Sequence, residues 1–326
     1  MVLFKRSLRR LLFSSVLLAA LAAPSAAASE RPALHFKIFA RTGIRLTDVV
    51  WTGRRFLYIE NTTNALSAAG PAGTPVHKFA SLPKMSEETR CVASPGGHGF
   101  PAHRIYCHTP DNKIYQLSRN GTRVSVFATL PNRSQSDGAL AFDPVGRFGY
   151  QLVAATGRSG HAKPAGGAVY TIGPTGHVQF VGNYPGPGGS DEIAIAPHRF
   201  GAVAGWALFG PDPGASNGAI VAINPSGHTR TLAQLPTGPN PIAVIAPGRR
   251  SAAPAGLYLA DTNTRIVYFA PAAQLAPYRG AVIIGSELKA DFWILRPRGR
   301  RFQLLKLATD LPPATHNLEA ASYVPG

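Results

Sequence analysis

The feature of this sequence that most restricts its fold is a sequence motif, or phrase, that recurs about every fifty residues along the chain. Each copy contains a strand, a turn and a second strand, and ends in an aromatic or apolar residue followed by proline. The prolines that end four copies are 48, 54 and 51 residues apart: Pro83, Pro131, Pro185 and Pro236. A later, more charged copy spans residues 291–312. A period of this length, built from about four short strands, is typical of the blades of a β-propeller.

A second phrase follows the first: a polar residue, a short run of small apolar residues, and then proline. It is clearest at residues 136–144, 190–197 and 240–247, and looser at residues 47–51, 90–95 and 317–325. Small apolar side chains are expected in strands that are packed on both faces. We therefore assign these runs to the innermost strands of the blades.

We predict an all-β fold, a single β-propeller domain over residues 29–326, with six four-stranded blades. The low share of charged residues (15%) and the 34 glycines and 29 prolines exclude a coiled coil or a long helical bundle. Residues 248–312 exceed one period and contain extra strands, so five and seven blades stay open, as does a two-sheet sandwich. Residues 35–41 look like the end of a blade. As the outer strand of the last blade they would close the ring by bringing the N- and C-terminal strands together.

Residues 1–28 are typical of a secretory signal peptide. Four basic residues precede an apolar run from Leu11 to Leu21, and small residues at positions 26–28 offer a cleavage site before Ser29. The run is too short to span a membrane, and no later stretch is long enough. We expect a secreted or otherwise extracytoplasmic protein without a membrane span.

An extracytoplasmic compartment is oxidising and allows disulfides to form, and the chain has two cysteines, Cys91 and Cys107. A hairpin that turns within residues 96–99 would place them opposite each other on adjacent strands. We therefore predict a disulfide between them.

Residues 257–268, Leu-Tyr-Leu-Ala-Asp-Thr-Asn-Thr-Arg-Ile-Val-Tyr, resemble the strand phrase of NHL-repeat propellers and of streptogramin-lyase-like proteins. Asp137-Gly, followed by Asp-Pro-Val-Gly-Arg at residues 143–147, is similar to a phrase of the regucalcin-type lactonases and gluconolactonases. The resemblance implies a six-bladed propeller.

For regucalcin-like enzymes the same resemblance implies a divalent metal, held at the central channel by a Glu, an Asn and an Asp. Here the position that would carry the Asn is Ser136, and the first blade has no glutamate-rich opening phrase. For streptogramin lyases it implies a magnesium-assisted elimination that uses a His. No phrase of this chain identifies that His.

Polar residues recur just before the inner strands or at their first residues, and so near one mouth of the channel. They are Asp48, Arg90, Asp137, Asp191, Glu192, Asn240, Asn317 and Glu319. Carboxylate and amide oxygens suit Ca²⁺ or Mg²⁺, and one carboxylate could act as a general base. We name Asp137, Asp191 and Glu319 as candidate metal ligands and candidate catalytic residues. The alternative is structural, because Asp and Asn at such positions often cap turns and could also tie neighbouring blades together.

Three histidines, His98, His103 and His108, cluster in the second repeat, and we expect them to be solvated loop residues rather than metal ligands. The formal charge of the chain is +17. Its basic residues are scattered, with local groups at residues 54–55, 249–250 and 296–301, and no nucleic-acid motif appears. We expect an anionic envelope ligand or a small molecule as the partner, no specific nucleic acid, and a monomer.

The sequence is compatible with two functions. The first is a binding protein that holds a small or polymeric ligand at the channel mouth, with a divalent cation as an optional part of the site. The second is a metal-assisted hydrolase or lyase that acts on a lactone or a sugar-acid-like substrate. The sequence favours the first, because no complete catalytic phrase is present.

Overall fold

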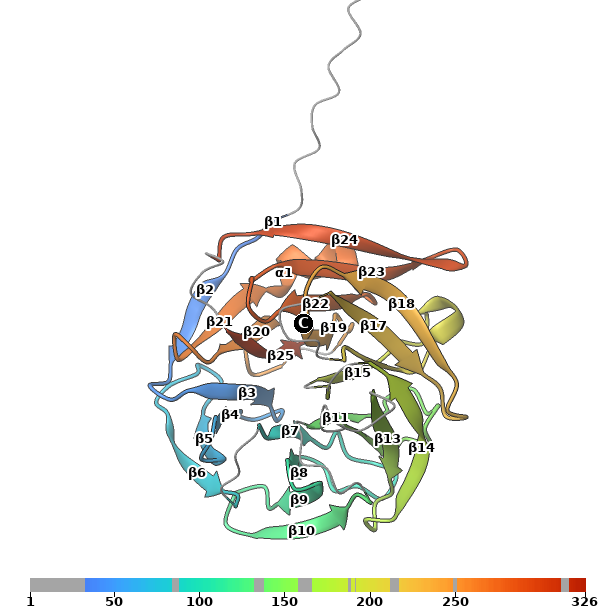
Figure 1. Ribbon diagram of the computed structural model, residues 1–326. Coiled ribbons are helices and arrows are strands. Elements are labelled where there is room, and N and C mark those ends of the chain that lie inside the picture. The colour runs from blue at the N-terminus through green and yellow to red at the C-terminus, as the bar shows by residue number, and fades with distance from the viewer. Residues whose placement is uncertain are drawn as a thin grey trace, which may run out of the picture. The chain divides into compact units, whose positions relative to one another are not determined.

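A computed structural model describes residues 33–83, 88–131, 138–157, 166–186, 189–190, 192–211, 217–248, 251–311 and 317–326. These residues form six antiparallel sheets arranged as blades around a central channel, as predicted (Figure 1). The predicted signal peptide lies outside the described residues, so it and the domain boundary at residue 29 stay predictions. Within the described ranges, no helix has the length and apolar character needed to cross a membrane.

The first four blades follow one another along the chain, and each runs from its innermost to its outermost strand. Blade 1 consists of β3 (Leu46–Trp51), β4 (Phe56–Glu60), β5 (Ala65–Ala69) and β6 (His77–Ser81). Blade 2 consists of β7 (Arg90–Ala93), β8 (Ile105–Thr109), β9 (Lys113–Leu117) and β10 (Val124–Thr129). Blade 3 consists of β11 (Gly138–Phe142), β12 (Leu152–Thr156), β13 (Gly166–Ile172) and β14 (Val178–Pro185). Blade 4 consists of β15 (Ile193–Ile195), β16 (Ala207–Phe209), β17 (Gly218–Ile223) and β18 (Thr229–Leu235), with the short 3₁₀ helix η1 (Gly201–Val203) between its first two strands.

The last two blades are interlocked. Blade 5 consists of β19 (Pro239–Val244), β22 (Val282–Ser286), β23 (Phe292–Arg298) and β24 (Arg301–Thr309), with β1 (Ala33–Leu34) added in parallel outside β24. Blade 6 consists of β25 (Leu318–Val324), β20 (Gly256–Asp261), β21 (Ile266–Pro271) and β2 (Lys37–Arg41). The helices α1 (Ala272–Leu275) and η2 (Ala276–Tyr278) connect β21 to β22.

This interlocking explains the long stretch at residues 248–312. After the inner strand β19 of blade 5, the chain crosses to form the β20–β21 hairpin of blade 6, and then returns to complete blade 5 with β22, β23 and β24. The extra strands in the sequence therefore belong to the last blade and do not make a seventh.

The ring is closed in the last blade. The N-terminal strand β2 is its outer strand and the C-terminal strand β25 its inner strand, with β21 and β20 between them (Figure 1). The residues just before β2 also tie blade 5, since β1 pairs with the end of β24. The prediction for residues 35–41 is confirmed.

The core is divided among the seams between blades. Six clusters of buried apolar residues each join two neighbouring blades. Along β4, Phe56 and Tyr58 pack toward blade 6. The alternate residues Leu57 and Ile59 pack toward blade 2. Because successive side chains of a strand point to opposite faces, a strand buried on both faces is apolar throughout.

The repeated phrase has a structural reason. The apolar residue that precedes the proline is buried at the end of the outer strand at Leu82, Leu130 and Leu235. At the turn between the third and fourth strands, Gly121 has a φ of +76°, and a side chain there would press on the Phe79 carbonyl of the preceding blade. The repeated residues are therefore needed for contacts between neighbouring blades as well as for the strands themselves.

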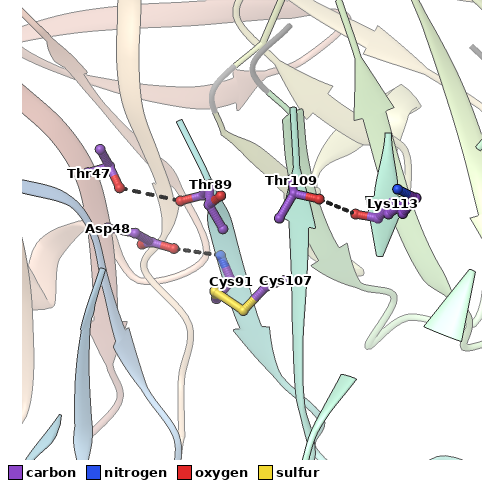
Figure 2. Close-up of a disulfide and its surroundings, with 7 residues drawn as sticks. All are labelled: Thr47, Asp48, Thr89, Cys91, Cys107, Thr109 and Lys113. Carbon is purple, nitrogen blue, oxygen red and sulfur yellow. Dashed lines mark hydrogen bonds between the residues drawn. A yellow bond between two sulfur atoms is a disulfide. The ribbon is translucent and has the colours of Figure 1, made fainter. Parts of the chain in front are cut away.

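The predicted disulfide is present. Cys91 on β7 and Cys107 on β8 are register partners, and their sulfur atoms are bonded (Figure 2). Both cysteines are buried in the seam between blades 1 and 2.

Replacing Cys91 and Cys107 together with alanine is expected to lower the free energy of unfolding by about 3 kcal/mol, because the unfolded chain regains the entropy of an open loop. Denaturant unfolding of the wild type and the double variant measures this difference. Reductant should lower the stability of the wild type and leave that of the double variant unchanged. Equal midpoints for the two oxidised proteins would contradict a stabilising role.

Candidate functional site

The six inner strands line the central channel in the order β3, β7, β11, β15, β19 and β25, and β25 contacts β3 again. All six run in the same direction along it. We call the end where they begin the amino mouth and the end where they finish the carboxyl mouth. A cavity of about 290 Å³ lies in the channel and is lined by residues of all six strands.

Asp48 links the first two blades at this cavity. It is buried on β3, and its Oδ2 accepts the backbone N–H of Cys91 on β7 at 2.7 Å (Figure 2). Next to it, the Thr47 hydroxyl donates to the Thr89 carbonyl at 3.4 Å. A carboxylate that accepts a neighbouring blade's N–H is the structural role that the sequence left open for this position.

Arg90 is the cation of the channel. Its Nη2 lies 2.6 Å from Glu88 Oε2 and 3.3 Å from Glu319 Oε2, and the side chain is almost completely buried. Glu319 lies on β25, and its other oxygen accepts the Asn317 amide at 2.6 Å. Both oxygens of Glu319 are therefore engaged by protein donors.

Glu192 spans three blades. From the start of β15, its Oε1 accepts the backbone N–H of Ala321 on β25 at 2.8 Å, and its Oε2 accepts the N–H of Ile242 on β19. These two strands bring blades 5 and 6 to the same carboxyl group. Glu192 thus braces the side of the ring where the chain crosses between blades.

The channel holds more carboxyl groups than one arginine can neutralise. Burial raises the pKa of Glu192 to about 8, against the opposing effect of Arg90 and of its two N–H donors, and the charge of Asp48 raises it further. Burial also raises the pKa of Asp48 to about 6, again opposed by Arg90. At neutral pH, Glu192 is mainly protonated and Asp48 mainly ionised.

This protonation predicts a fall in stability as the pH rises through neutrality. Because burial raises the pKa of Glu192 to about 8 in the folded chain, the folded state keeps a proton near neutral pH that the unfolded state has already released. The free energy of unfolding should fall between pH 6.5 and 8, by at most about 1.4 kcal/mol per pH unit for this proton, and the fall should level off above pH 8. Urea unfolding across this range measures the slope.

The control for this prediction is a pair of variants. In Glu192→Gln the slope should nearly disappear, and a constant loss should remain because the amide offers one acceptor to two N–H groups. In Glu60→Gln, outside the channel, the wild-type slope should persist. An unchanged slope in Glu192→Gln would refute the assignment.

The structure accounts for part of the predicted ring. Asp48, Arg90, Glu192, Asn317 and Glu319 lie around the amino half of the channel and bond to one another or to neighbouring strands, and Asn240 is buried on β19. Asp137 and Asp191 lie outside the described residues. Among the residues that the structure describes, no group of His, Cys, Asp and Glu could hold a metal ion.

The prediction for the histidines is wrong for His108. It lies on β8, in register with Arg90, and is fully buried. Burial lowers the pKa of His108 to about 4, so the ring is neutral at physiological pH. A side chain at Gly138 of blade 3 would collide with this ring. The strand continues past Cys107, and for that reason the next residue points into a seam rather than into solvent.

A second and larger cavity opens at the carboxyl mouth. Its volume is about 970 Å³, and it lies over blades 3 to 6. The floor is apolar and includes Ile193, Ile242 and Ala321, which also line the channel cavity. The two cavities therefore adjoin, and Glu192 lines the channel cavity.

The wall of this carboxyl-mouth pocket is basic. Arg199, Arg279, Arg296 and His198 line it, and none of its lining residues is acidic. Within the described ranges, no carboxylate forms an ion pair with any of the three arginines. Arginines without a carboxylate partner in a concave pocket can bind an anion through several N–H donors.

Two tyrosines complete the wall. Tyr278 and Tyr323 line the pocket, and burial raises the pKa of each phenol, opposed by Arg296 for Tyr278 and by Arg279 for Tyr323. Both phenols therefore stay protonated and keep an O–H donor beside a guanidinium. The basic group that contains Arg296 is visible in the sequence, but Arg199 and Arg279 come to it from other parts of the chain.

Comparison with known proteins identifies the fold. No known protein family and no curated protein matches the sequence. The PQQ-bound aldose sugar dehydrogenase (Adh) of Streptomyces coelicolor is 15% identical, with a TM-score of 0.51, over 84% of this chain and 87% of that chain. A Lactobacillus plantarum protein is 9% identical (TM-score 0.44; 86% and 88% covered). The computationally designed Ika8 protein is 9% identical with a TM-score of 0.42, and the match covers 86% of this chain but only 65% of the designed one. The likeness to the sugar dehydrogenase shows the fold alone at this low identity, and the resemblance to NHL-repeat, streptogramin-lyase and regucalcin-type proteins is not confirmed. The chain is a six-bladed β-propeller.

Proposed function

We propose that this protein is an exported binding protein that holds a small organic anion with an apolar body in the carboxyl-mouth pocket. Export is supported by the signal-like segment at residues 1–28 and by the Cys91–Cys107 disulfide. The observation that supports the binding role is the pocket itself. Its lining combines three arginines with an apolar floor and contains no acidic residue.

The chemistry of the pocket defines the class of ligand. The guanidinium groups of Arg199, Arg279 and Arg296 suit a carboxylate, sulfonate or phosphate, and the Ile and Ala side chains of the floor suit a hydrocarbon part. The carboxyl groups of the channel serve as a brace beneath it, because they are already bonded to N–H groups and to Arg90.

Binding of decanoate, measured by calorimetry, tests this proposal, with decyltrimethylammonium as the matched cation. Decanoate should bind and the cation should not. The double variant Arg279→Gln/Arg296→Gln should weaken decanoate binding at least about tenfold, since a charge-assisted hydrogen bond is worth about 1.5–3 kcal/mol. The matched control, Arg54→Gln/Arg123→Gln, removes two arginines elsewhere and should bind like the wild type. Equal binding of both probes, or no effect of the pocket variant, would refute the proposal.

The alternative, a metal-assisted hydrolase or lyase, depends on Asp137, Asp191 and Glu319. Glu319 does not fit a metal site as placed, because both of its oxygens already accept protein donors. Asp137 and Asp191 lie outside the described residues, so their role as metal ligands stays a prediction. Unfolding of the metal-stripped protein with added Ca²⁺ or Mg²⁺ would favour this function only if one ion raises the midpoint and Asp137→Ala abolishes the shift.

A further inference from the structure

Exposed arginines gather on one face of the ring. We call the connections at the carboxyl ends of the first and third strands of the blades, together with the segment that leads into β22, the carboxyl face. Apart from the pocket arginines, it carries exposed arginines from blades 1, 2, 3 and 5: Arg54, Arg123, Arg147, Arg298, Arg300 and Arg301. With Arg199 of the pocket in blade 4, each of blades 1 to 5 contributes at least one.

Carboxylates are nearly absent from this face. Among the described residues, Asp143 is the single acidic residue in these connections, and it is buried. Its two oxygens accept the backbone N–H groups of Val145, Gly146, Phe148 and Tyr150, at 2.7–3.2 Å. Its charge therefore holds a loop in place and does not offset the arginines.

The other described carboxylates outside the channel lie at the opposite end of the blades. They are found where second strands end, where third strands begin, or after fourth strands: Glu60, Asp111, Asp261, Glu287, Asp291 and Asp310. The cations of that end, such as Arg41, Arg45, Arg265 and Lys289, are therefore balanced by carboxylates, whereas the exposed arginines of the carboxyl face are not. Such a separation gives the molecule a preferred orientation toward an anionic partner.

We propose that the carboxyl face docks on an anionic lipid bilayer, which places the mouth of the pocket against the membrane. The arginines are spread around the channel, so a small ligand in the pocket would reach only a few of them. An extended anionic surface would reach them all. Guanidinium groups bind phosphate through paired N–H donors and remain charged at any physiological pH.

An aromatic pair on the same face supports a bilayer as the partner. Tyr150 is 41% exposed, and its ring stacks on His98 with 3.8 Å between centroids. An exposed tyrosine with a polar tip suits the boundary between headgroups and acyl chains. This inference stands apart from the identity of the pocket's ligand, since the arginines that carry it lie outside the pocket.

Sedimentation of the purified protein with lipid vesicles tests the inference. Vesicles with about 30% phosphatidylglycerol should bind the protein, and pure phosphatidylcholine vesicles should not. The variant Arg54→Gln/Arg123→Gln/Arg147→Gln/Arg300→Gln should bind at least about a hundredfold more weakly, at about fivefold per arginine. Salt at about 0.5 M should release the wild type.

A charge-matched variant on the opposite face is the control. The variant Arg41→Gln/Arg45→Gln/Arg265→Gln/Lys289→Gln also removes four positive charges from exposed positions, and it should keep wild-type binding to the vesicles. Equal weakening in both variants would show that only net charge matters and would overturn the inference. Binding to soluble polyphosphate without binding to vesicles would also overturn it, in favour of a soluble anionic polymer. Unchanged decanoate binding in the carboxyl-face variant would confirm that its effect is separate from the pocket.

Discussion

Replacing Arg90 with methionine is expected to lower the free energy of unfolding by about 3–5 kcal/mol, the usual cost of removing one partner from a buried ion pair. Arg90 contacts Glu88 and Glu319 directly, and its charge also lowers the pKa values of Asp48 and Glu192. Methionine keeps much of the volume but leaves these carboxyl groups without their cation. Urea unfolding at neutral pH measures the loss.

Arg123→Met is the matched control for Arg90→Met, because Arg123 is exposed at a hairpin turn. Its effect should stay within about 0.5 kcal/mol. A second readout separates electrostatics from packing. In Arg90→Met the loss should shrink as the pH falls toward 5, since the carboxyl groups then take up protons. A loss that does not change with pH would show that Arg90 acts through its volume alone.

Truncating Phe56 to alanine is expected to cost about 3–5 kcal/mol, because it opens a cavity in the seam where the ring closes. Phe56 is fully buried, and its ring centroid lies 4.6 Å from that of Tyr258 on blade 6 and 5.0 Å from that of Phe39 on β2. The N-terminal strand, blade 1 and the last blade therefore meet on this one side chain.

Phe180→Ala provides the comparison for Phe56→Ala. Phe180 lies on the outer strand β14 and is 54% exposed, so its loss should cost less than about 1 kcal/mol. Thermal or denaturant unfolding of the two variants gives the contrast. Similar losses for both would mean that the closing seam is not tightly packed around Phe56.

The inner strands and the disulfide were predictable because their signals are local. A short apolar run, followed by proline in five of the six copies, marks an inner strand whichever blade it belongs to, and the six runs form β3, β7, β11, β15, β19 and β25. Cys91 and Cys107 flank a glycine-rich turn, so their pairing follows from the hairpin. The exchange of strands between blades 5 and 6 has no such local signal. The hairpin at residues 256–271 forms the same strands in either blade.

The candidate site was also predictable only in part. Polar residues at the start of inner strands were identified from their recurrence, yet their partners lie on other blades. The bonds of Glu192 to Ala321 and Ile242 join residues that are 129 and 50 positions away in the chain. The carboxyl-mouth pocket was not predicted, since Arg199 and Arg279 come from two separate connections and Arg296 from strand β23, and only the tertiary structure brings them together.

The sequence by itself determined the repeating unit, the positions of the inner strands and the disulfide, because strand patterns, turns and hairpin pairings depend on residues close together in the chain. Only the tertiary structure decided which blade receives the β20–β21 hairpin and how the carboxyl groups of the channel share one arginine. It also decided which mouth is basic. These properties depend on closing the ring, which sets distances between side chains that no spacing along the sequence specifies.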